Sequence, residues 1–300
     1  AGGRVAAQCF GFSGSVVRCR FGGAVPLYAR LVPLPDEEVS IIEQERYLNL
    51  VRTSSEKISQ GELVKTVPSR CKSIVLKKGF DPFLFLDQIN EQYPSCFNYL
   101  SIIPDEGIWI GVSPELLLEA NKRGFNTTSL AGTMKNGDES NWTNKELEEQ
   151  KIVTQFLLDE LAQLNYQEIE IDGPKTVFTG NLYHLKTNFK VNWDKYALDE
   201  VLRIAHYLHP TPATAGLPRK EAIAFLIENE GYNRGFYSGF FGLLDIQYKT
   251  TLYVNLRCMK LNKNNAVLYA GAGVTSESDP QKEYLETESK IQTLLKFLDA

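Results

Sequence analysis

The sequence has 300 residues, of which 43% are hydrophobic and 23% charged, and it carries a formal net charge of −5. These values are ordinary for a globular protein with a substantial core. The acidic balance excludes the basic footprint of a nucleic-acid-binding protein. No apolar run reaches the length needed to span a bilayer. We therefore expect neither a nucleic-acid partner nor a membrane association.

Five cysteines are scattered along the chain, are odd in number and show no paired spacing. This usage is typical of reduced thiols and indicates a cytoplasmic protein. The cysteines are Cys9, Cys19, Cys71, Cys96 and Cys258.

The N-terminal region differs in composition from the rest. Residues 1–34 contain four arginines and no acidic residue, and an acidic joint with two prolines follows at 33–38. We predict an atypical tail or remnant over 1–40 and one domain over 41–300. A targeting peptide is the alternative interpretation of the tail, since such peptides are Arg-rich and poor in acidic residues. Only 64 residues precede Lys65, and the sequence begins at Ala1, so a fragment or a processed chain is also expected.

Strand-like and helix-like segments follow one another irregularly after this joint. Thr143 and Glu146 have the spacing of a capping box, which predicts a long helix to about Leu164. Asp279 and Pro280 predict the start of a final helix, which runs to about Leu298. Many short strands joined by turns favour an α+β fold with large antiparallel sheets over a doubly wound parallel one. The other predicted helices are 43–60 and 83–92, and the predicted strands are 64–67, 97–102, 108–112, 167–171, 184–191, 236–244, 251–259 and 266–270.

A carboxylate lies on the apolar face of the helix after Thr143. Glu149 shares a stripe with Ile152, Val153 and Phe156, at spacings of three, four and seven. A buried carboxylate must pair, bind a metal or become protonated. Taken alone, a structural ion pair is the simpler interpretation, because Glu160 lies near the same stripe.

The final helix also carries charges on one side. Glu283, Glu286 and Lys290 fall at i, i+3 and i+7. Two carboxylates at this spacing could bind Mg²⁺, which prefers hard oxygen ligands. A solvated charged face with a Glu286–Lys290 pair is the alternative. The Gly-Ala-Gly sequence at 271–273 could let the backbone approach an anion, although a simple tight turn explains it equally well.

Seven motifs, in order along the chain, resemble those of the chorismate-utilising enzymes. This family includes isochorismate, salicylate, anthranilate and aminodeoxychorismate synthases, and the resemblance covers about residues 43–298. It implies that the 41–300 domain binds chorismate in a cleft between sheet and helices, with Mg²⁺ as cofactor. The motifs occupy 113–117, 130–133, 148–150, 209–213, 234–239, 271–274 and 278–290.

The resemblance implies catalytic roles for several of these residues. Lys65 matches the general base of the water-using members, and Glu115 matches the general acid. The two groups should face each other across the cleft without a direct salt bridge, because such a bridge would hold both in the wrong protonation state. Glu149 and Glu286 match the two Mg²⁺-binding carboxylates, with Glu283 acting directly or through a water.

The resemblance also implies a set of substrate-binding residues. Tyr237, Arg257, Gly271 and Gly273 match positions that hold the enolpyruvyl carboxylate, to which an arginine fork can bind bidentately. The other expected lining residues are Ala131, Gly132, Thr133, His184, Thr214 and Lys290.

Two positions distinguish branches of the family. Aminodeoxychorismate synthases carry a nucleophilic lysine where Ala131 stands, and anthranilate-type members lack a lysine at position 65 and take ammonia from a glutaminase. Lys65 and Ala131 therefore favour water addition at C2, the isochorismate synthase reaction, without a glutaminase subunit. A salicylate synthase and a truncated inactive member remain alternatives, and the sequence does not separate menaquinone from siderophore pathways. Two residues depart from the pattern of the family. Gln150 stands where a histidine is common, and Pro68 interrupts the apolar run that usually follows the position of Lys65.

Overall fold

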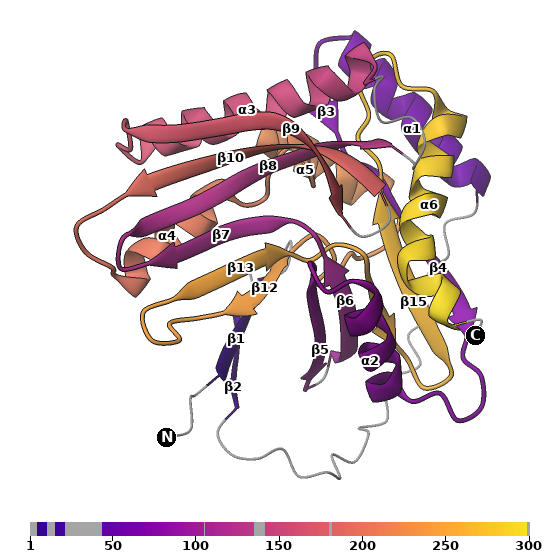
Figure 1. Cartoon of the computed structure of the whole chain (residues 1–300). Helices are drawn as coiled ribbons and strands as arrows, with labels where there is room; N and C mark the ends of the chain where they lie inside the picture. The colour runs from indigo at the N-terminus through magenta and orange to yellow at the C-terminus, as the bar shows by residue number, and fades with distance from the viewer. Residues whose placement is uncertain are drawn as a thin grey trace.

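The computed structural model describes residues 5–10, 16–21, 44–104, 106–134, 142–179 and 182–298. Within these ranges the chain forms six helices and three antiparallel sheets, so the predicted α+β fold is confirmed (Figure 1). None of the described helices combines the length and the apolar character that a membrane span requires.

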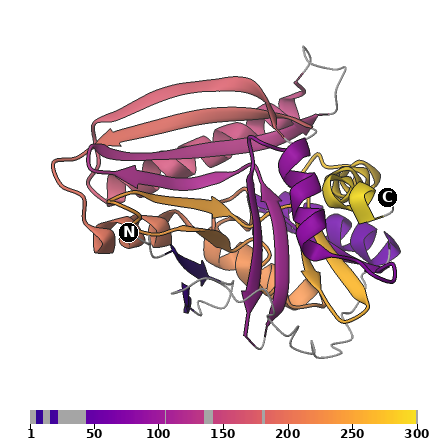
Figure 2. The same ribbon diagram turned by 60° about the horizontal axis from the view of Figure 1, so that its bottom comes forward.

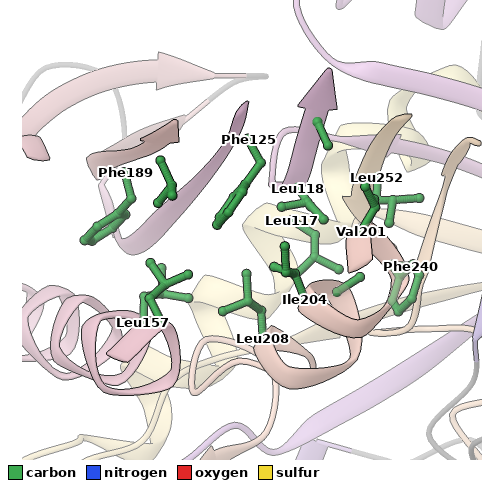
Figure 3. Close-up of a cluster of buried hydrophobic side chains, with 14 of the residues drawn as sticks. Leu117, Leu118, Phe125, Leu157, Phe189, Val201, Ile204, Leu208, Phe240 and Leu252 are labelled. Carbon is green, nitrogen blue, oxygen red and sulfur yellow. The ribbon is translucent and has the colours of Figure 1, made fainter. Parts of the chain in front are cut away.

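The largest sheet has eight strands in the order β2-β1-β12-β13-β7-β8-β10-β9. Helices α3 (Asn144–Gln163) and α4 (Leu198–Leu208) cover its apolar face. Figure 3 shows Leu157 and Leu208 of these helices directed toward Phe189 and other side chains of the sheet. The strands are β1 (Val5–Phe10), β2 (Val16–Phe21), β7 (Leu116–Asn121), β8 (Gly124–Met134), β9 (Ile169–Thr179), β10 (Leu182–Asn192), β12 (Phe240–Leu243) and β13 (Thr250–Val254).

The second sheet has five strands in the order β4-β15-β14-β6-β5. Helices α2 (Pro82–Gln92) and α6 (Pro280–Leu298) pack together against it, as Figure 2 shows. All residues of its strand β6 (Gly107–Ser113) are buried. The other strands are β4 (Ser69–Val75), β5 (Phe97–Ile103), β14 (Cys258–Leu261) and β15 (Asn265–Gly271).

A short third sheet pairs β3 (Lys65–Thr66) with β11 (Gly216–Leu217). Helices α1 (Gln44–Ser59) and α5 (Arg219–Asn229) pack beside it through a small apolar cluster. The main chain of Thr66 also bonds to Val274, just beyond β15. The chain at Lys65 is therefore fixed from two sides.

The chain crosses between the two large sheets at two adjacent places. One crossing joins β6 to β7 at Pro114 and Glu115, and the other joins β13 to β14 at residues 255–257. Backbone hydrogen bonds tie them together, because the N–H of Val254 donates to the Glu115 carbonyl at 2.9 Å. Glu115 and Arg257 thus both lie where the two sheets meet.

Several sequence predictions are corrected by the structure. The strand predicted over 251–259 is two strands in different sheets, because Arg257 adopts a left-handed backbone with φ of 46°. The strand predicted over 236–244 begins only at Phe240, since hydrogen-bonded turns occupy the preceding residues. The strand predicted over 167–171 extends to Thr179. Helices α4 and α5 were not predicted.

Part of the predicted N-terminal tail is structured. The hairpin β1–β2 pairs with the edge of the large sheet, with Phe10 opposite Phe240. The rest of residues 1–40 lies outside the described part of the chain, so the domain boundary stays a prediction. Among the described residues, Cys71, Cys96 and Cys258 are not joined in disulfides.

Candidate active site

One cavity between the two large sheets gathers the predicted site residues, and α3 and α6 contribute to its wall. Every predicted site residue except Glu283 lines it, namely Lys65, Glu115, Ala131, Gly132, Thr133, Glu149, His184, Thr214, Tyr237, Arg257, Gly271, Gly273, Glu286 and Lys290. The lining residues that the sequence analysis missed are Val67, Pro114, Leu130, Ala213, Leu256, Tyr269 and Ala270.

A buried ion pair joins Lys65 to Glu149. The Lys65 Nζ lies 3.5 Å from the Glu149 Oε1, and the two side chains are 2% and 8% exposed. Gly273 makes this arrangement possible, because a Cβ atom there would lie 1.9 Å from the same oxygen. The predicted burial of Glu149 is confirmed, and its charge is compensated by the residue expected to be the general base.

The two carboxylates of α6 that were predicted to bind Mg²⁺ are also paired with lysines. Glu283 accepts from Lys145 at 2.6 Å, and Glu286 accepts from Lys290 at 2.8 Å. Burial and the nearby Glu286 raise the pKa of Glu283 to about 7. Burial also disfavours the charged form of Glu286, but Lys290 and Lys145 outweigh it and lower the pKa of that carboxyl.

Glu283 departs in two ways from what the sequence suggested. It is buried, so the alternative of a solvated charged face is wrong at this position. It also lines a neighbouring hollow rather than the cavity itself, and that hollow shares Thr133 and Glu286 with the cavity. Its Oε2 atom is buried without a hydrogen-bond partner.

The oxygen atoms of these carboxylates decide whether a cation fits. The described residues contain no ready-made group of three His, Cys, Asp or Glu side chains that could hold a metal. However, Glu149 and Glu286 line one cavity, and Glu149 Oε1 and Glu283 Oε2 are buried without hydrogen-bond partners. The carboxylates of Glu149, Glu283 and Glu286 all interact electrostatically with the ammonium group of Lys145. Such oxygen donors suit a hard divalent cation such as Mg²⁺.

Glu115 has the properties of an acid that is protonated near neutrality. Burial raises its pKa to about 7, against the opposing effect of the cations Lys290, Lys65 and Arg257. In the described part of the chain Lys65 pairs with Glu149, and no ion pair links it to Glu115. The backbone N–H of Glu115 donates to the Ser113 hydroxyl at 3.3 Å and fixes the crossing strand.

His184 and Arg257 are joined in the cavity wall. The Arg257 guanidinium contacts the His184 Nε2 at 2.8 Å, and the His184 Nδ1 contacts the Gly132 carbonyl at 2.7 Å. Burial and the neighbouring Arg257 lower the pKa of His184 to about 3. The imidazole is therefore neutral at physiological pH.

An aromatic stack forms another part of the wall. Tyr237 stacks on Tyr269 with ring centroids 5.5 Å apart, and Tyr269 stacks on Trp109 at 5.4 Å. Burial raises the pKa of Tyr237 well above its ordinary value, so its hydroxyl stays protonated. Tyr269 belongs to none of the seven family motifs. Only the alternation of side chains along the predicted strand 266–270 could have indicated that it faces the cavity.

A second buried ion pair lies outside the cavity lining and binds the main chain of segments that line it. Arg234 pairs with Glu230 and donates to the carbonyls of Val67 at 2.7 Å and Thr214 at 2.9 Å. Glu230 accepts from the backbone N–H of Ser69 at 2.8 Å. The pair thus binds the main chain at Thr214 and at Val67 and Ser69, just beyond Lys65. The motif at 234–239 did not indicate this role.

Comparisons with known proteins indicate the family of the chain. The family model described as chorismate binding enzyme matches residues 32–299. Isochorismate synthase EntC of Escherichia coli (strain K12) is 29% identical over 269 residues, which cover 86% of this chain and 68% of EntC. Isochorismate synthase MenF of the same organism is 27% identical over 284 residues, which cover 88% of this chain and 65% of MenF. The chain thus spans about two thirds of the length of these relatives.

Solved structures show the same arrangement. A crystal structure described as a 2,3-dihydroxybenzoate-specific isochorismate synthase, DhbC, from Bacillus anthracis superposes with a TM-score of 0.85 at 28% identity, covering 99% of this chain and 83% of that one. Component I of anthranilate synthase from Streptococcus pneumoniae shares the fold, with a TM-score of 0.73 at 21% identity, covering 88% of this chain and 62% of that one. The chain therefore belongs to the family of chorismate-binding enzymes.

Proposed function

We propose that this chain is an isochorismate synthase, an isomerase that adds water at C2 of chorismate and releases the C4 hydroxyl. The observation that carries the proposal is the pair of Lys65 and Glu115, buried in one cavity and not bonded to each other. One can act as a base while the other acts as an acid. The similarity to EntC, MenF and DhbC supports the same reaction.

Lys65 would accept a proton from the attacking water, and Glu115 would donate a proton to the departing hydroxyl. Lys65 takes a proton from water as the water oxygen bonds to C2, and the ring double bond shifts as the C4–O bond breaks. Glu115 gives its proton to the departing hydroxyl, which leaves as water. One water is consumed and one is released, and the proton on Lys65 then returns to Glu115. The base form of Lys65 requires that its ammonium give up the ion pair with Glu149.

We further propose Mg²⁺ as cofactor, held by Glu149 and Glu286, with Glu283 acting directly or through a water. When bound, the ion would neutralise the ring carboxylate of chorismate. The buried Glu149 Oε1 and Glu283 Oε2, which accept no hydrogen bond, support this assignment.

The remaining cations of the cavity would hold the second carboxylate of chorismate. Arg257 lines the cavity beside Tyr237, and an arginine fork suits a carboxylate. Lys290 donates to the Gly271 carbonyl at 2.8 Å, so its ammonium is held at the same wall. We propose that Tyr237, Arg257 and the backbone at Gly271 and Gly273 form this subsite.

Two features favour water as the nucleophile. Ala131 offers no amine for covalent attack, and Lys65 is present as a base in the cavity. We therefore propose that no glutaminase subunit takes part. We also propose a cytoplasmic location, which the scattered cysteines, odd in number and without paired spacing, favour.

A product assay tests the proposal. The purified chain is incubated with chorismate and Mg²⁺, with and without ammonium, and the products are separated by chromatography. Isochorismate, formed equally in both mixtures, is expected. Anthranilate or aminodeoxychorismate would overturn the choice of nucleophile, and salicylate with pyruvate would show that the reaction continues to elimination. No turnover would favour an inactive family member.

A further inference from the structure

The pairing of β8 with β10 is irregular beside the cavity. Two residues of β8, Gly132 and Thr133, lie opposite the single residue His184 of β10, because the register shifts between Tyr183 and Leu185. Such bulges re-aim side chains and occur near active sites. Here the bulge places His184 in the cavity wall, with the Gly132 carbonyl directed at its ring.

Both ring nitrogens of His184 are engaged. A guanidinium can only donate, so the Nε2 that contacts Arg257 at 2.8 Å must be an acceptor. The proton of the neutral ring therefore resides on Nδ1, which donates to the Gly132 carbonyl at 2.7 Å. A ring with both nitrogens used in this way is not available to carry protons to or from a substrate.

Arg257 has an unusual backbone at the same place. Its φ of 46° lies in the left-handed region, which non-glycine residues rarely adopt and which is often found at functional sites. The residue stands at the crossing from β13 to β14, and its carbonyl accepts from the Val112 N–H at 3.1 Å. The backbone thus directs the Arg257 side chain to the cavity, and His184 restrains its guanidinium group.

We infer that His184 is a positioning residue, which holds the Arg257 guanidinium in place to receive a carboxylate of the substrate. The Gly132 carbonyl selects the imidazole tautomer that can accept from Arg257. The identity of that carboxylate as one of chorismate rests on the proposed function, whereas the contact between His184 and Arg257 does not. The low pKa of His184 agrees with a ring that stays neutral.

Three substitutions separate the two bonds of the ring. Glutamine in His184→Gln can place an amide oxygen near the former Nε2 and still accept from Arg257. Asparagine in His184→Asn is too short for this and can reach only the Gly132 carbonyl, while His184→Leu can make neither bond. A hydrogen bond to a charged group corresponds to roughly a ten- to hundredfold change in affinity. We therefore expect Kd and KM for chorismate to rise by that factor in H184N and H184L, with a much smaller change in kcat, and to be largely restored in H184Q.

Calorimetric binding of chorismate and steady-state kinetics measure these effects, with the exposed His206→Gln as a control that should match the unmodified chain. Equal defects in H184Q and H184L, or chorismate affinity retained in H184L, would overturn the inference. A loss of kcat at unchanged KM would instead assign His184 to the chemical step.

A spectroscopic test does not depend on activity. The ¹⁵N shifts of the His184 ring should report the neutral tautomer protonated at Nδ1, and the Nε2 shift should move in Arg257→Leu. The opposite tautomer, or an unmoved Nε2 shift, would contradict the contact. If the unmodified chain neither binds nor converts chorismate while this signature is present, the proposed function fails and the His184–Arg257 contact stands.

Discussion

Lys65 and Glu149 form a buried ion pair, with 3.5 Å between the Lys65 Nζ and the Glu149 Oε1. The base expected for the reaction is therefore bound to a carboxylate expected to hold the metal. Glu283 and Glu286 are likewise paired with lysines. In this state three ammonium groups compensate three carboxylates, and a divalent cation would compete with them for the same oxygens.

Substitution of Lys65 should affect both turnover and stability, and a second substitution at Glu149 should restore the stability alone. Lys65→Ala should reduce turnover by roughly 10²–10⁴-fold, the usual contribution of a positioned base, with less effect on chorismate binding. It should also lower the free energy of unfolding by about 3–5 kcal/mol, because Glu149 is left as an unpaired buried charge. The double variant Lys65→Ala/Glu149→Gln removes that charge and should recover much of the stability but none of the turnover. Kinetics and urea unfolding measure both effects, and near-normal turnover in K65A would exclude Lys65 as the base.

The carboxylates can be tested for metal binding directly. Mg²⁺ affinity, measured by calorimetry without substrate, should fall at least tenfold in Glu149→Gln and in Glu286→Gln. Glu288→Gln is the matched control, because Glu288 lies on the same helix but pairs with Arg70 and Lys72. Unchanged affinity in both E149Q and E286Q would show that the ion, if one is used, binds elsewhere.

The sequence predicted the α+β class of the fold and a set of residues that line one cavity, but it did not predict every element around that cavity. The site residues belong to motifs with specific side chains, whereas helices α4 and α5 lack the usual start signals. Their N-cap residues are Ala197 and Pro218, and neither provides a side-chain cap. The break after β13 has no glycine or proline to mark it, because Arg257 itself adopts the left-handed backbone. Contacts between distant segments, such as Lys65 with Glu149, cannot be derived from local patterns.

Glu115 should make both activity and stability depend on pH. Its pKa is raised by burial from 4.5 to about 7. Below about pH 4.5 the carboxyl is protonated in the folded and the unfolded chain, so it causes no change in stability. As the pH rises toward 7 the unfolded chain loses the proton first, so the free energy of unfolding falls by about 3 kcal/mol and the loss persists above pH 7.

Glu115→Gln removes this titration and therefore tests it. The variant should gain stability relative to the unmodified chain between pH 4.5 and 8, while its turnover is lost because it has no acid. The turnover of the unmodified chain should decline above about pH 7 as the acid ionises. Urea unfolding across this pH range measures the effect, with the exposed Glu62→Gln as control. A constant stability difference between E115Q and the unmodified chain would mean that Glu115 titrates normally.

Gly273 should be intolerant of even one added methyl group. A Cβ atom there would lie 1.9 Å from the Glu149 Oε1 and 3.1 Å from the Lys65 Cε, so the ion pair must separate or the main chain at Gly273 must shift. At Gly271 the nearest contacts of such an atom are 3.0–3.2 Å, which neighbouring groups can relieve by moving a few tenths of an ångström.

Gly273→Ala should therefore lower turnover at least tenfold and reduce the free energy of unfolding by about 1–3 kcal/mol, the usual cost of overpacking. Gly271→Ala should have clearly smaller effects on both quantities. The contrast is informative because both glycines belong to the same Gly-Ala-Gly segment at the end of β15, and a general need for a flexible backbone there would affect them alike. Kinetics and thermal unfolding of the two variants measure the difference. Equal effects would show that backbone flexibility in this segment, rather than space for Glu149 beside Lys65, requires glycine at position 273.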